Sequence, residues 1–236
     1  MFQFKQFVIR QDRTAMKVCT DACVLGAWAA VETGDRLLDI GTGTGLLALM
    51  AAQRNGHAHI DAVDVDEAAA GQARANVADS PFGERITVHQ TAIQHFAPAR
   101  RYDHILTNPP FYINSLRSPD RAVNRALHAD ELPVADLLAA VGRLLAPTGT
   151  WWVLLPPPEM ARLKKQAATL PEPLFLSQQL HLRHHAHKPV FRHLTAFRFG
   201  PEPANVPTQT LDIYEPDGRT YTAAFRALLQ PYYLIF

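Results

Sequence analysis

The sequence predicts an α/β protein with a mainly parallel sheet and helices on both of its faces. Strand-like and helix-like segments alternate along most of the 236 residues, which is the pattern of a parallel sheet. The strand-like segments are near-continuous apolar runs, as expected when both faces of a sheet are covered. Two later segments instead alternate apolar and polar residues, and they predict an antiparallel hairpin at the edge of the sheet.

The parallel part can be followed element by element. Five segments have the length and apolar content of buried strands: Arg36 to Ile40, His59 to Asp64, Ile86 to His89, Tyr102 to Thr107 and Thr150 to Leu155. Three helices are predicted between them, and their stop and start signals are specific. They are Leu46 to Arg54 ended by Asn55-Gly56, a helix capped by Asp66 that ends before Pro81, and 134–145 ended by Pro147 and Gly149.

The remainder of the chain has a different character. The hairpin is predicted from Leu174 to Leu182 and from His193 to Gly200, and the proline-rich stretch 201–207 is predicted to be an extended connector. Residues 221–229 read as a helix and 232–236 as an apolar strip packed on the body. We expect a cap segment (1–34), a core (35–200) and a C-terminal extension (201–236).

The composition is that of a globular protein and excludes several classes. Apolar residues make up 47% and charged residues 19% of the chain, which argues against disorder. No apolar run reaches the ~18 residues of a membrane span, and the first residues lack the layout of a secretory signal. Cys19 and Cys23 are the only cysteines, too few for a disulfide framework or a zinc site. We therefore expect a cytoplasmic protein without a metal, with both thiols packed as small hydrophobes.

The segment Asp-Ile-Gly-Thr-Gly-Thr-Gly, residues 39–45, lies between the first predicted strand and the first predicted helix. Glycines at such a turn let the backbone approach a nucleotide-like ligand closely. The main alternative is a nicotinamide or flavin site, but that site requires G-x-G-x-x-G, and residue 46 is leucine. The residues expected to line the ligand are Asp39, Gly41, Thr42, Gly43 and Gly45.

Three acids have distinct expected roles around this loop. Asp39 is placed to fix the loop and to hold water or an ammonium group. Asp64, followed by Val65 at the end of the second strand, is placed to accept hydrogen bonds from two ribose hydroxyls. Asp66 is the alternative ribose acceptor, but we prefer it as a helix cap.

A second motif, Asn108-Pro109-Pro110-Phe111, follows the fourth predicted strand. An exocyclic amine on a base is a poor nucleophile because its lone pair is delocalised into the ring. The Asn108 side-chain oxygen and the Pro109 carbonyl can each accept one N–H, which frees that lone pair, and the prolines fix both acceptors in advance. Phe111 would stack on an extruded base. Alone, the tetrapeptide also fits a rigid turn; with the glycine loop, it predicts methyl transfer from S-adenosylmethionine to an exocyclic nitrogen.

The net charge is only +1, but the basic residues are unevenly distributed. Between residues 160 and 200, Glu172 is the only acid beside seven Lys or Arg residues. We interpret five basic side chains as a phosphate-contacting rim, and ordinary solvated faces are the alternative. They are Arg117, Arg121, Arg125, Lys188 and Arg192. The histidines at 181, 184, 185, 187 and 193 fit contact with RNA, or plain surface exposure, better than a metal site, because strand alternation would scatter them over both faces.

These motifs resemble the class I S-adenosylmethionine-dependent methyltransferases that carry N-P-P-[YF]. More narrowly, the segments 2–7 and 25–28, the run Met16-Lys17-Val18-Cys19-Thr20-Asp21 and the ending Tyr232-Tyr233-Leu234 resemble the bacterial tRNA1(Val) adenine-N6 methyltransferase family. The resemblance implies a Rossmann-like sheet of seven strands with a reversed last strand, and N6-methylation of the adenine 3′ of the anticodon. It also implies that Lys17, Thr20 and Asp21 lie near the methionine end of the cofactor, under an amino-terminal segment that covers the site.

The chain departs from this family at two positions. Phe111 stands where the family favours tyrosine, and Ala92 stands where an acid usually binds the cofactor adenine, so backbone groups or Gln94 would take that role. Three other functions stay open: N5-methylation of a glutamine in a protein such as a release factor, N6-methylation of adenine in rRNA or DNA, and RNA binding without catalysis. Intact Asp39, Asp64 and Asn108 argue against the last. No obligatory protein partner is evident.

Overall fold

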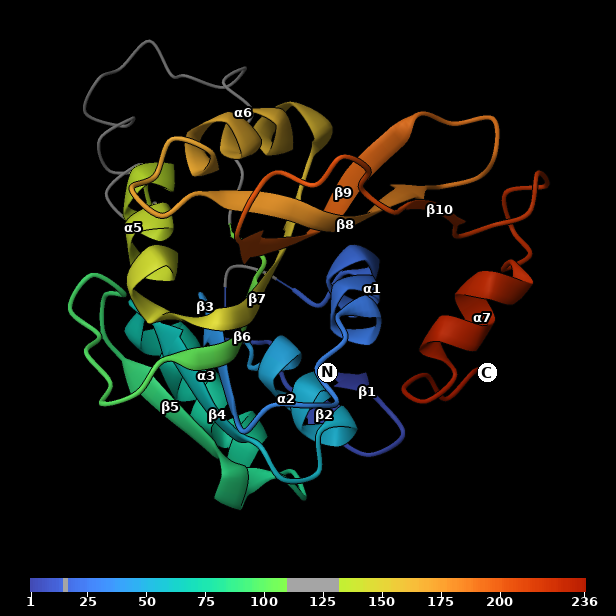
Figure 1. Cartoon of the computed structure of the whole chain (residues 1–236). Helices are drawn as coiled ribbons and strands as arrows, with labels where there is room; N and C mark the ends of the chain where they lie inside the picture. The colour runs from blue at the N-terminus through green and yellow to red at the C-terminus, as the bar shows by residue number, and fades with distance from the viewer. Residues whose placement is uncertain (15–16, 110–131) are drawn as a thin grey trace, which may run out of the picture.

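The computed structural model describes residues 1–14, 17–109 and 132–236, and a single large sheet runs through its centre (Figure 1). Its eight strands are hydrogen-bonded in the order β10-β8-β9-β7-β6-β3-β4-β5. The parallel strands are β3 (Arg36–Ile40), β4 (His59–Asp64), β5 (Ile86–Gln90), β6 (Tyr102–Thr107) and β7 (Leu145–Leu155). The hairpin is β8 (Leu174–Arg183) and β9 (Val190–Phe199), with β9 antiparallel to both neighbours. The predicted α/β class and the reversed strand are confirmed.

Helices cover both faces of the sheet (Figure 1). One face carries α1 (Thr20–Trp28), α2 (Leu46–Arg54), α3 (Glu67–Ala78) and α7 (Ala223–Leu229). The other carries α5 (Val134–Leu144) and α6 (Pro157–Ala167). Neighbouring strand residues divide between two hydrophobic clusters, with Trp152 in the first and Trp151 in the second. The continuous apolar strands therefore fill two cores, one on each side of the sheet.

The first half of the sheet follows its local sequence signals closely. β3, β4, β6 and α2 have the predicted bounds. Asp66 caps α3, because its Oδ1 accepts a hydrogen bond from the Ala69 N–H at 2.7 Å. α3 ends at Ala78, before Pro81, and the short 3₁₀ turn η1 (Gly83–Arg85) leads into β5.

The second half differs from expectation in three places. β7 begins directly after α5 and includes Pro147 and Gly149, which we predicted to be a helix stop. A Cβ on Gly149 would lie 2.9 Å from the Tyr102 carbonyl oxygen, so this glycine allows two strands to approach closely where their pairing is irregular. Helix α6 was not predicted; it starts at Pro157 and buries Met160, Leu163 and Ala167.

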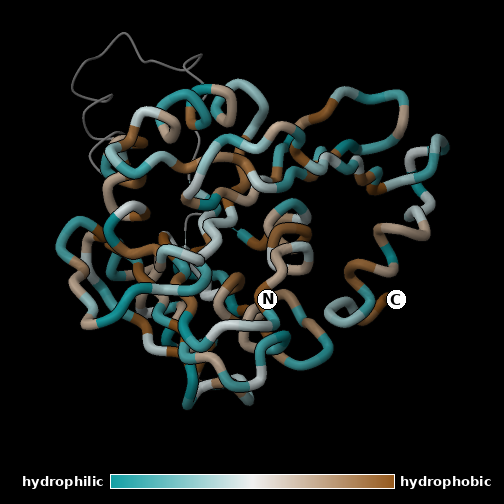
Figure 2. The backbone as a smooth tube through the Cα atoms, in the orientation of Figure 1, coloured by the Kyte–Doolittle hydropathy of each residue, from teal (hydrophilic) through white to brown (hydrophobic). Residues whose placement is uncertain are grey.

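The third difference is an additional strand. β10 (Thr208–Asp212) follows the predicted connector and pairs in parallel with β8. It brings the sheet to eight strands, and the β8–β9 hairpin is therefore not at the edge as predicted. The β8–β9 loop itself is strongly hydrophilic (Figure 2).

The two ends of the chain pack against each other. β1 (Phe2–Gln3) and β2 (Val8–Ile9) form a small hairpin, and Phe4 makes a bridge with Tyr233. The Lys5 N–H donates to the Tyr232 carbonyl at 2.8 Å, so the apolar strip at the end of the chain packs on the body as predicted. Among the cysteines, Cys23 is buried and Cys19 half-buried.

Candidate functional site

The glycine loop joins β3 to α2, and hydrogen bonds to the Asp39 carboxylate fix its conformation. The Thr42 hydroxyl and the Ala48 N–H donate to Asp39 Oδ2 at 2.6 and 3.2 Å. The other carboxylate oxygen, Oδ1, is buried and has no hydrogen-bond partner among the described residues. Burial raises the pKa of Asp39 to about 7. The loop therefore presents one carboxylate oxygen that lacks a partner, as a site for a cationic or N–H group would.

The glycines leave open space above this loop. Gly41 and Gly43 have φ angles of 71° and 57°, in the left-handed region that favours glycine. An added Cβ would meet nothing within 4 Å at either position. No side chain therefore covers the backbone at Gly41 and Gly43, where a ligand would approach. The positive φ angles at these two positions favour glycine.

Asp64 ends β4 beside this loop. Its Oδ2 accepts from the Gly43 N–H at 2.8 Å and its Oδ1 accepts from the Asp66 N–H at 3.0 Å. The Asp64 side chain therefore fixes the loop and keeps lone pairs for further donors. Burial raises its pKa. Val65 is 57% exposed, an apolar surface next to the carboxylate. Asp66 caps α3 through its Oδ1, whereas Asp64 contacts the glycine loop itself through the Gly43 N–H.

Asn108 and Pro109 follow β6 at the same edge of the sheet. Thr107, the last residue of β6, pairs with Ile40, the last residue of β3. The carboxyl ends of the two strands are therefore adjacent, and Asn108 leaves the sheet one strand away from the glycine loop. Asn108 Oδ1 is buried without a hydrogen-bond partner among the described residues. Pro109 is buried, whereas Pro110 and Phe111 lie outside the described residues.

The amino-terminal segment is fastened beside the glycine loop. Asn76 on α3 connects the two, because its amide donates to the carbonyls of Arg10 and Thr44, both at 2.8 Å. Lys17 Nζ donates to the Gln11 carbonyl at 2.8 Å. Thr20 is exposed at the start of α1. Nothing local in the sequence marks Asn76, which reasoning from the sequence missed.

Asp21 has a partner that the sequence did not indicate. Its Oδ2 accepts from Arg192 Nε at 2.7 Å, and the two side chains are 11% and 21% exposed. Arg192 also lies over the Phe191 ring, 5.3 Å from its centroid. A residue expected near the cofactor and a residue expected on the phosphate rim are thus joined to each other. Because they are 171 positions apart, no sequence spacing could reveal the pair.

The adenine end of the expected cofactor site has an unusual composition. Ala92 is half-buried in the turn after β5. That turn is fixed to β4, because the Thr91 N–H donates to the Asp64 carbonyl at 2.9 Å. Gln94, the alternative we considered, donates from Nε2 to Asp136 at 2.9 Å. With Gln94 directed to α5, backbone groups of this turn are the better candidates for adenine recognition.

Of the expected rim, the structure describes two residues. Lys188 is exposed in the β8–β9 loop, and its N–H donates to the His185 carbonyl at 2.9 Å. This loop extends beyond the same edge of the sheet as Asn108, because His193 pairs with Leu155 at the carboxyl end of β7. Arg117, Arg121 and Arg125 lie outside the described residues.

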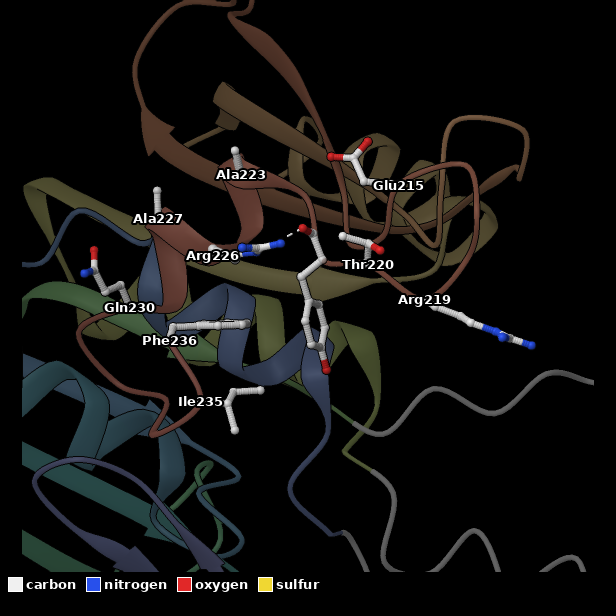
Figure 3. A pocket seen from close by; sticks show the side chains of 10 residues that line it. Glu215, Arg219, Thr220, Ala223, Arg226, Ala227, Gln230, Ile235 and Phe236 are labelled. Carbon is white, nitrogen blue, oxygen red and sulfur yellow. Dashed lines mark hydrogen bonds between the residues drawn. The ribbon is translucent and has the colours of Figure 1, made fainter.

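A separate groove runs along α7, with a volume of about 920 Å³. Arg219, Arg226, Ile235 and Phe236 are among its lining residues (Figure 3). None of the predicted site residues lines it. Within the part of the chain that the structure describes, no three His, Cys, Asp or Glu side chains are grouped to hold a metal. The described helices include none that is long and apolar enough to cross a membrane.

Comparison with known proteins identifies the family to which this chain belongs. Residues 24–156 match the model of the methyltransferase small domain. A protein of Dyadobacter fermentans named tRNA1(Val) (adenine(37)-N6)-methyltransferase is 50% identical over 236 residues, which cover 100% of this chain and 98% of that protein. A protein of the same name from Serratia proteamaculans is 41% identical and covers 100% of this chain and 90% of its own length.

The solved structures agree on the fold. A crystal structure from Agrobacterium tumefaciens, named a predicted O-methyltransferase, superimposes with a TM-score of 0.68 at 17% identity. The match covers 89% of this chain and 96% of that one, and it shows the shared fold alone. On the two full-length relatives and the domain match, the chain belongs to the tRNA1(Val) (adenine(37)-N6)-methyltransferase family.

Proposed function

We propose that this protein transfers a methyl group from S-adenosylmethionine to N6 of adenine 37 in tRNA1(Val). The observation that carries the proposal is the position of Asn108. Its side-chain oxygen is buried and without a partner among the described residues, one strand from the glycine loop. Burying a hydrogen-bond acceptor without a donor destabilises a folded protein. One of the two N–H groups of an exocyclic amine would supply the donor that Asn108 Oδ1 lacks. The relatives that share the whole chain carry the same activity in their name.

The residues around the glycine loop fit the cofactor. We propose that Gly41, Thr42, Gly43 and Gly45 form its cradle, with Asp39 Oδ1 facing the ammonium of the methionine moiety. Asp64 would accept from the ribose hydroxyls, and Val65 and the backbone at Ala92 would contact the adenine. When bound, S-adenosylmethionine supplies an electrophilic methyl group on a sulfonium centre.

The chain's own contribution to the reaction is positioning. Asn108 Oδ1 and the Pro109 carbonyl would each accept one N–H of the adenine amino group, which withdraws the nitrogen lone pair from the ring. Phe111 would stack on the extruded base. No strong base is needed, because the proton can leave the nitrogen after it has been alkylated. Pro110 would keep the acceptors in place.

The finer parts of the proposal concern the surroundings of this site. Residues 1–34 would act as a cap on the core 35–200, with Lys17, Thr20 and Asp21 at its cofactor side and 201–236 as an extension. Lys188 and the arginines at 117, 121, 125 and 192 would form the phosphate rim. We also propose that the protein acts in the cytoplasm, without an obligatory protein partner.

Transfer of labelled methyl from S-adenosylmethionine to a tRNA1(Val) transcript tests the proposal. Mass spectrometry should find N6-methyladenosine at position 37 and none in a transcript with guanosine there. Labelling of a release factor in place of tRNA would favour the glutamine methyltransferase instead. Failure to label tRNA, release factor, rRNA or DNA, with S-adenosylhomocysteine still bound, would favour a protein that binds RNA without catalysis.

A further inference from the structure

A cluster of basic side chains lies on the α6 face of the sheet, outside the site described above. Lys164 comes from α6, His181 from β8 and His193 from β9, and we call these three residues the α6 cluster. The two histidine rings are stacked, with centroids 4.4 Å apart and an interplanar angle of 21°. From the sequence we expected RNA contact or plain surface exposure for the histidines of this hairpin, and nothing in the sequence indicated that two of them meet.

Gln179 holds the cluster together. Its Oε1 accepts from Lys164 Nζ at 3.4 Å and lies 3.1 Å from His181 Nε2. Its Nε2 donates to the Thr195 hydroxyl at 2.9 Å. One neutral amide therefore orients two basic groups, and it brings no negative charge to balance them.

The cluster has unused hydrogen-bonding capacity and no counter-charge. His193 Nδ1 is buried with no partner among the described residues. Within that part of the chain, no ion pair joins the three basic groups to a carboxylate. Burial, followed by the charges of His181 and Lys164, lowers the pKa of His193 to about 4. Burial also lowers the pKa values of Lys164 and His181. An anion at this position would satisfy the open nitrogen and relieve the repulsion.

Strand register places the cluster near the reacting groups. Val153 on β7 pairs with Thr107 on one side and with Thr195 on the other. Two residues further along β7, Leu155 pairs with His193, so His193 lies at the carboxyl end of β7. Two interstrand spacings, about 10 Å, separate β9 from β6, which Asn108 and Pro109 follow. The cluster thus lies at the carboxyl edge of the sheet, within reach of the nucleotides next to an extruded base.

We propose that Lys164, His181 and His193 bind a backbone phosphate of the tRNA next to the adenosine that is methylated. This inference rests on the proposed function. A phosphate suits the cluster because it accepts several hydrogen bonds at once and carries the charge that the three residues lack. As it binds, the histidines take up protons, because a nearby negative charge favours their cationic forms. Contact with the backbone would position the substrate without reading its sequence.

The test uses the full-length protein and an unmodified tRNA1(Val) transcript. Lys164→Gln and His193→Gln are compared with Lys165→Gln and His57→Gln, two exposed basic residues outside the cluster and the phosphate rim. We expect each cluster variant to weaken tRNA binding about tenfold, as loss of a charged hydrogen bond does. The log–log salt slope should flatten by about one unit. The controls and the affinity for S-adenosylhomocysteine should not change.

A second readout separates phosphate binding from a structural role. Wild-type affinity for tRNA should increase as the pH falls from 7.5 to 5.5, and His193→Gln should reduce this increase while His57→Gln should not. A transcript with neutral methylphosphonate links flanking adenosine 37 should bind wild type weakly, and Lys164→Gln should add little further loss.

The outcomes are distinct. If the cluster variants lower the melting temperature but leave tRNA affinity and its salt slope at wild-type values, the cluster only fastens α6 to the hairpin and the inference is wrong. Equal effects of the cluster and control variants would show general surface charge and would also overturn it. If wild type neither binds nor methylates the transcript, the proposed function itself fails, together with the inference.

Discussion

The half of the molecule that carries the glycine loop and the half that carries the hairpin hold their polar groups in different ways. Around the loop, some partners are near in sequence, since Thr42 donates to Asp39 and the Ala69 N–H to Asp66, each three residues apart. The Gly43 N–H donates to Asp64, which is 21 residues away at the end of the next strand. In the hairpin half, the hydrogen bond from Lys164 to Gln179 joins residues 15 positions apart, and the one from Arg192 to Asp21 joins residues 171 positions apart.

This contrast separates two kinds of site. The loop half is built from successive strand-turn-helix units whose turns fix some of their own side chains, and Asp64 joins two of these units through the Gly43 N–H. The hairpin half gains its arrangement only after α6, β8, β9 and α1 have packed together. We therefore expect substitutions in the loop half to have local effects, and a substitution of Arg192 in the hairpin half to affect two functions at once.

Asn108 lies at the border between the halves, and its loss should have the largest effect. We expect Asn108→Ala to reduce methyl transfer by at least ~10²-fold, since a preorganised polar group of the transition state is removed. Affinity for S-adenosylhomocysteine should stay near the wild-type value. Turnover measured beside calorimetry checks both expectations, with Thr107→Ser as a neighbouring control. Near-normal turnover in Asn108→Ala would remove this residue from the mechanism.

The second prediction tests whether the loop half really acts locally. Asp64→Ala should weaken binding of S-adenosylhomocysteine by at least ~1.5 kcal/mol, because two hydroxyls lose a charged acceptor. Asp66→Ala should instead lower the free energy of unfolding by about 1 kcal/mol through loss of the cap on α3, with little change in affinity. Calorimetry and urea unfolding of both variants distinguish the two roles. The reverse pattern would transfer the ribose contact to Asp66.

The same contrast explains how much the sequence could predict. β3, α2, β4 and the cap at Asp66 follow signals within a few residues, such as apolar runs, Asn55-Gly56 and a capping acid. The start of β7 was missed because Gly149 serves a close approach to Tyr102, a contact between distant residues. Helix α6 was missed although its three buried residues, Met160, Leu163 and Ala167, recur at helical spacing. The pairing of Asp21 with Arg192 and the stacking of His181 on His193 exist only in the folded chain.

A third prediction concerns the pH dependence of S-adenosylhomocysteine binding, and it tests the role of Asp39, whose Oδ1 has no partner among the described residues. Asp39 has a pKa of about 7 because it is buried. An ammonium group beside it would favour the carboxylate and lower that pKa, so binding should release the proton and strengthen as pH rises. Between pH 6 and pH 8, affinity for S-adenosylhomocysteine should increase by up to about tenfold. Calorimetry at several pH values checks this, and Asp39→Asn should abolish the dependence. A flat profile in wild type would mean that Asp39 does not face the ammonium.

The smallest expected effect tests whether the hairpin half serves two functions. From sequence, Lys188 and Arg192 both belong to the phosphate rim, and reversing their charge should weaken tRNA binding without touching the cofactor site. Because Arg192 also pairs with Asp21 at the start of α1, Arg192→Gln should weaken S-adenosylhomocysteine binding about threefold as well, the scale of a partly exposed ion pair. Lys188→Gln should change only tRNA affinity and its salt slope. Binding of both ligands at three salt concentrations decides between these cases. If the two variants behave alike toward the cofactor, the Arg192–Asp21 pair does not link the two halves, and Arg192 belongs with Lys188 on the rim.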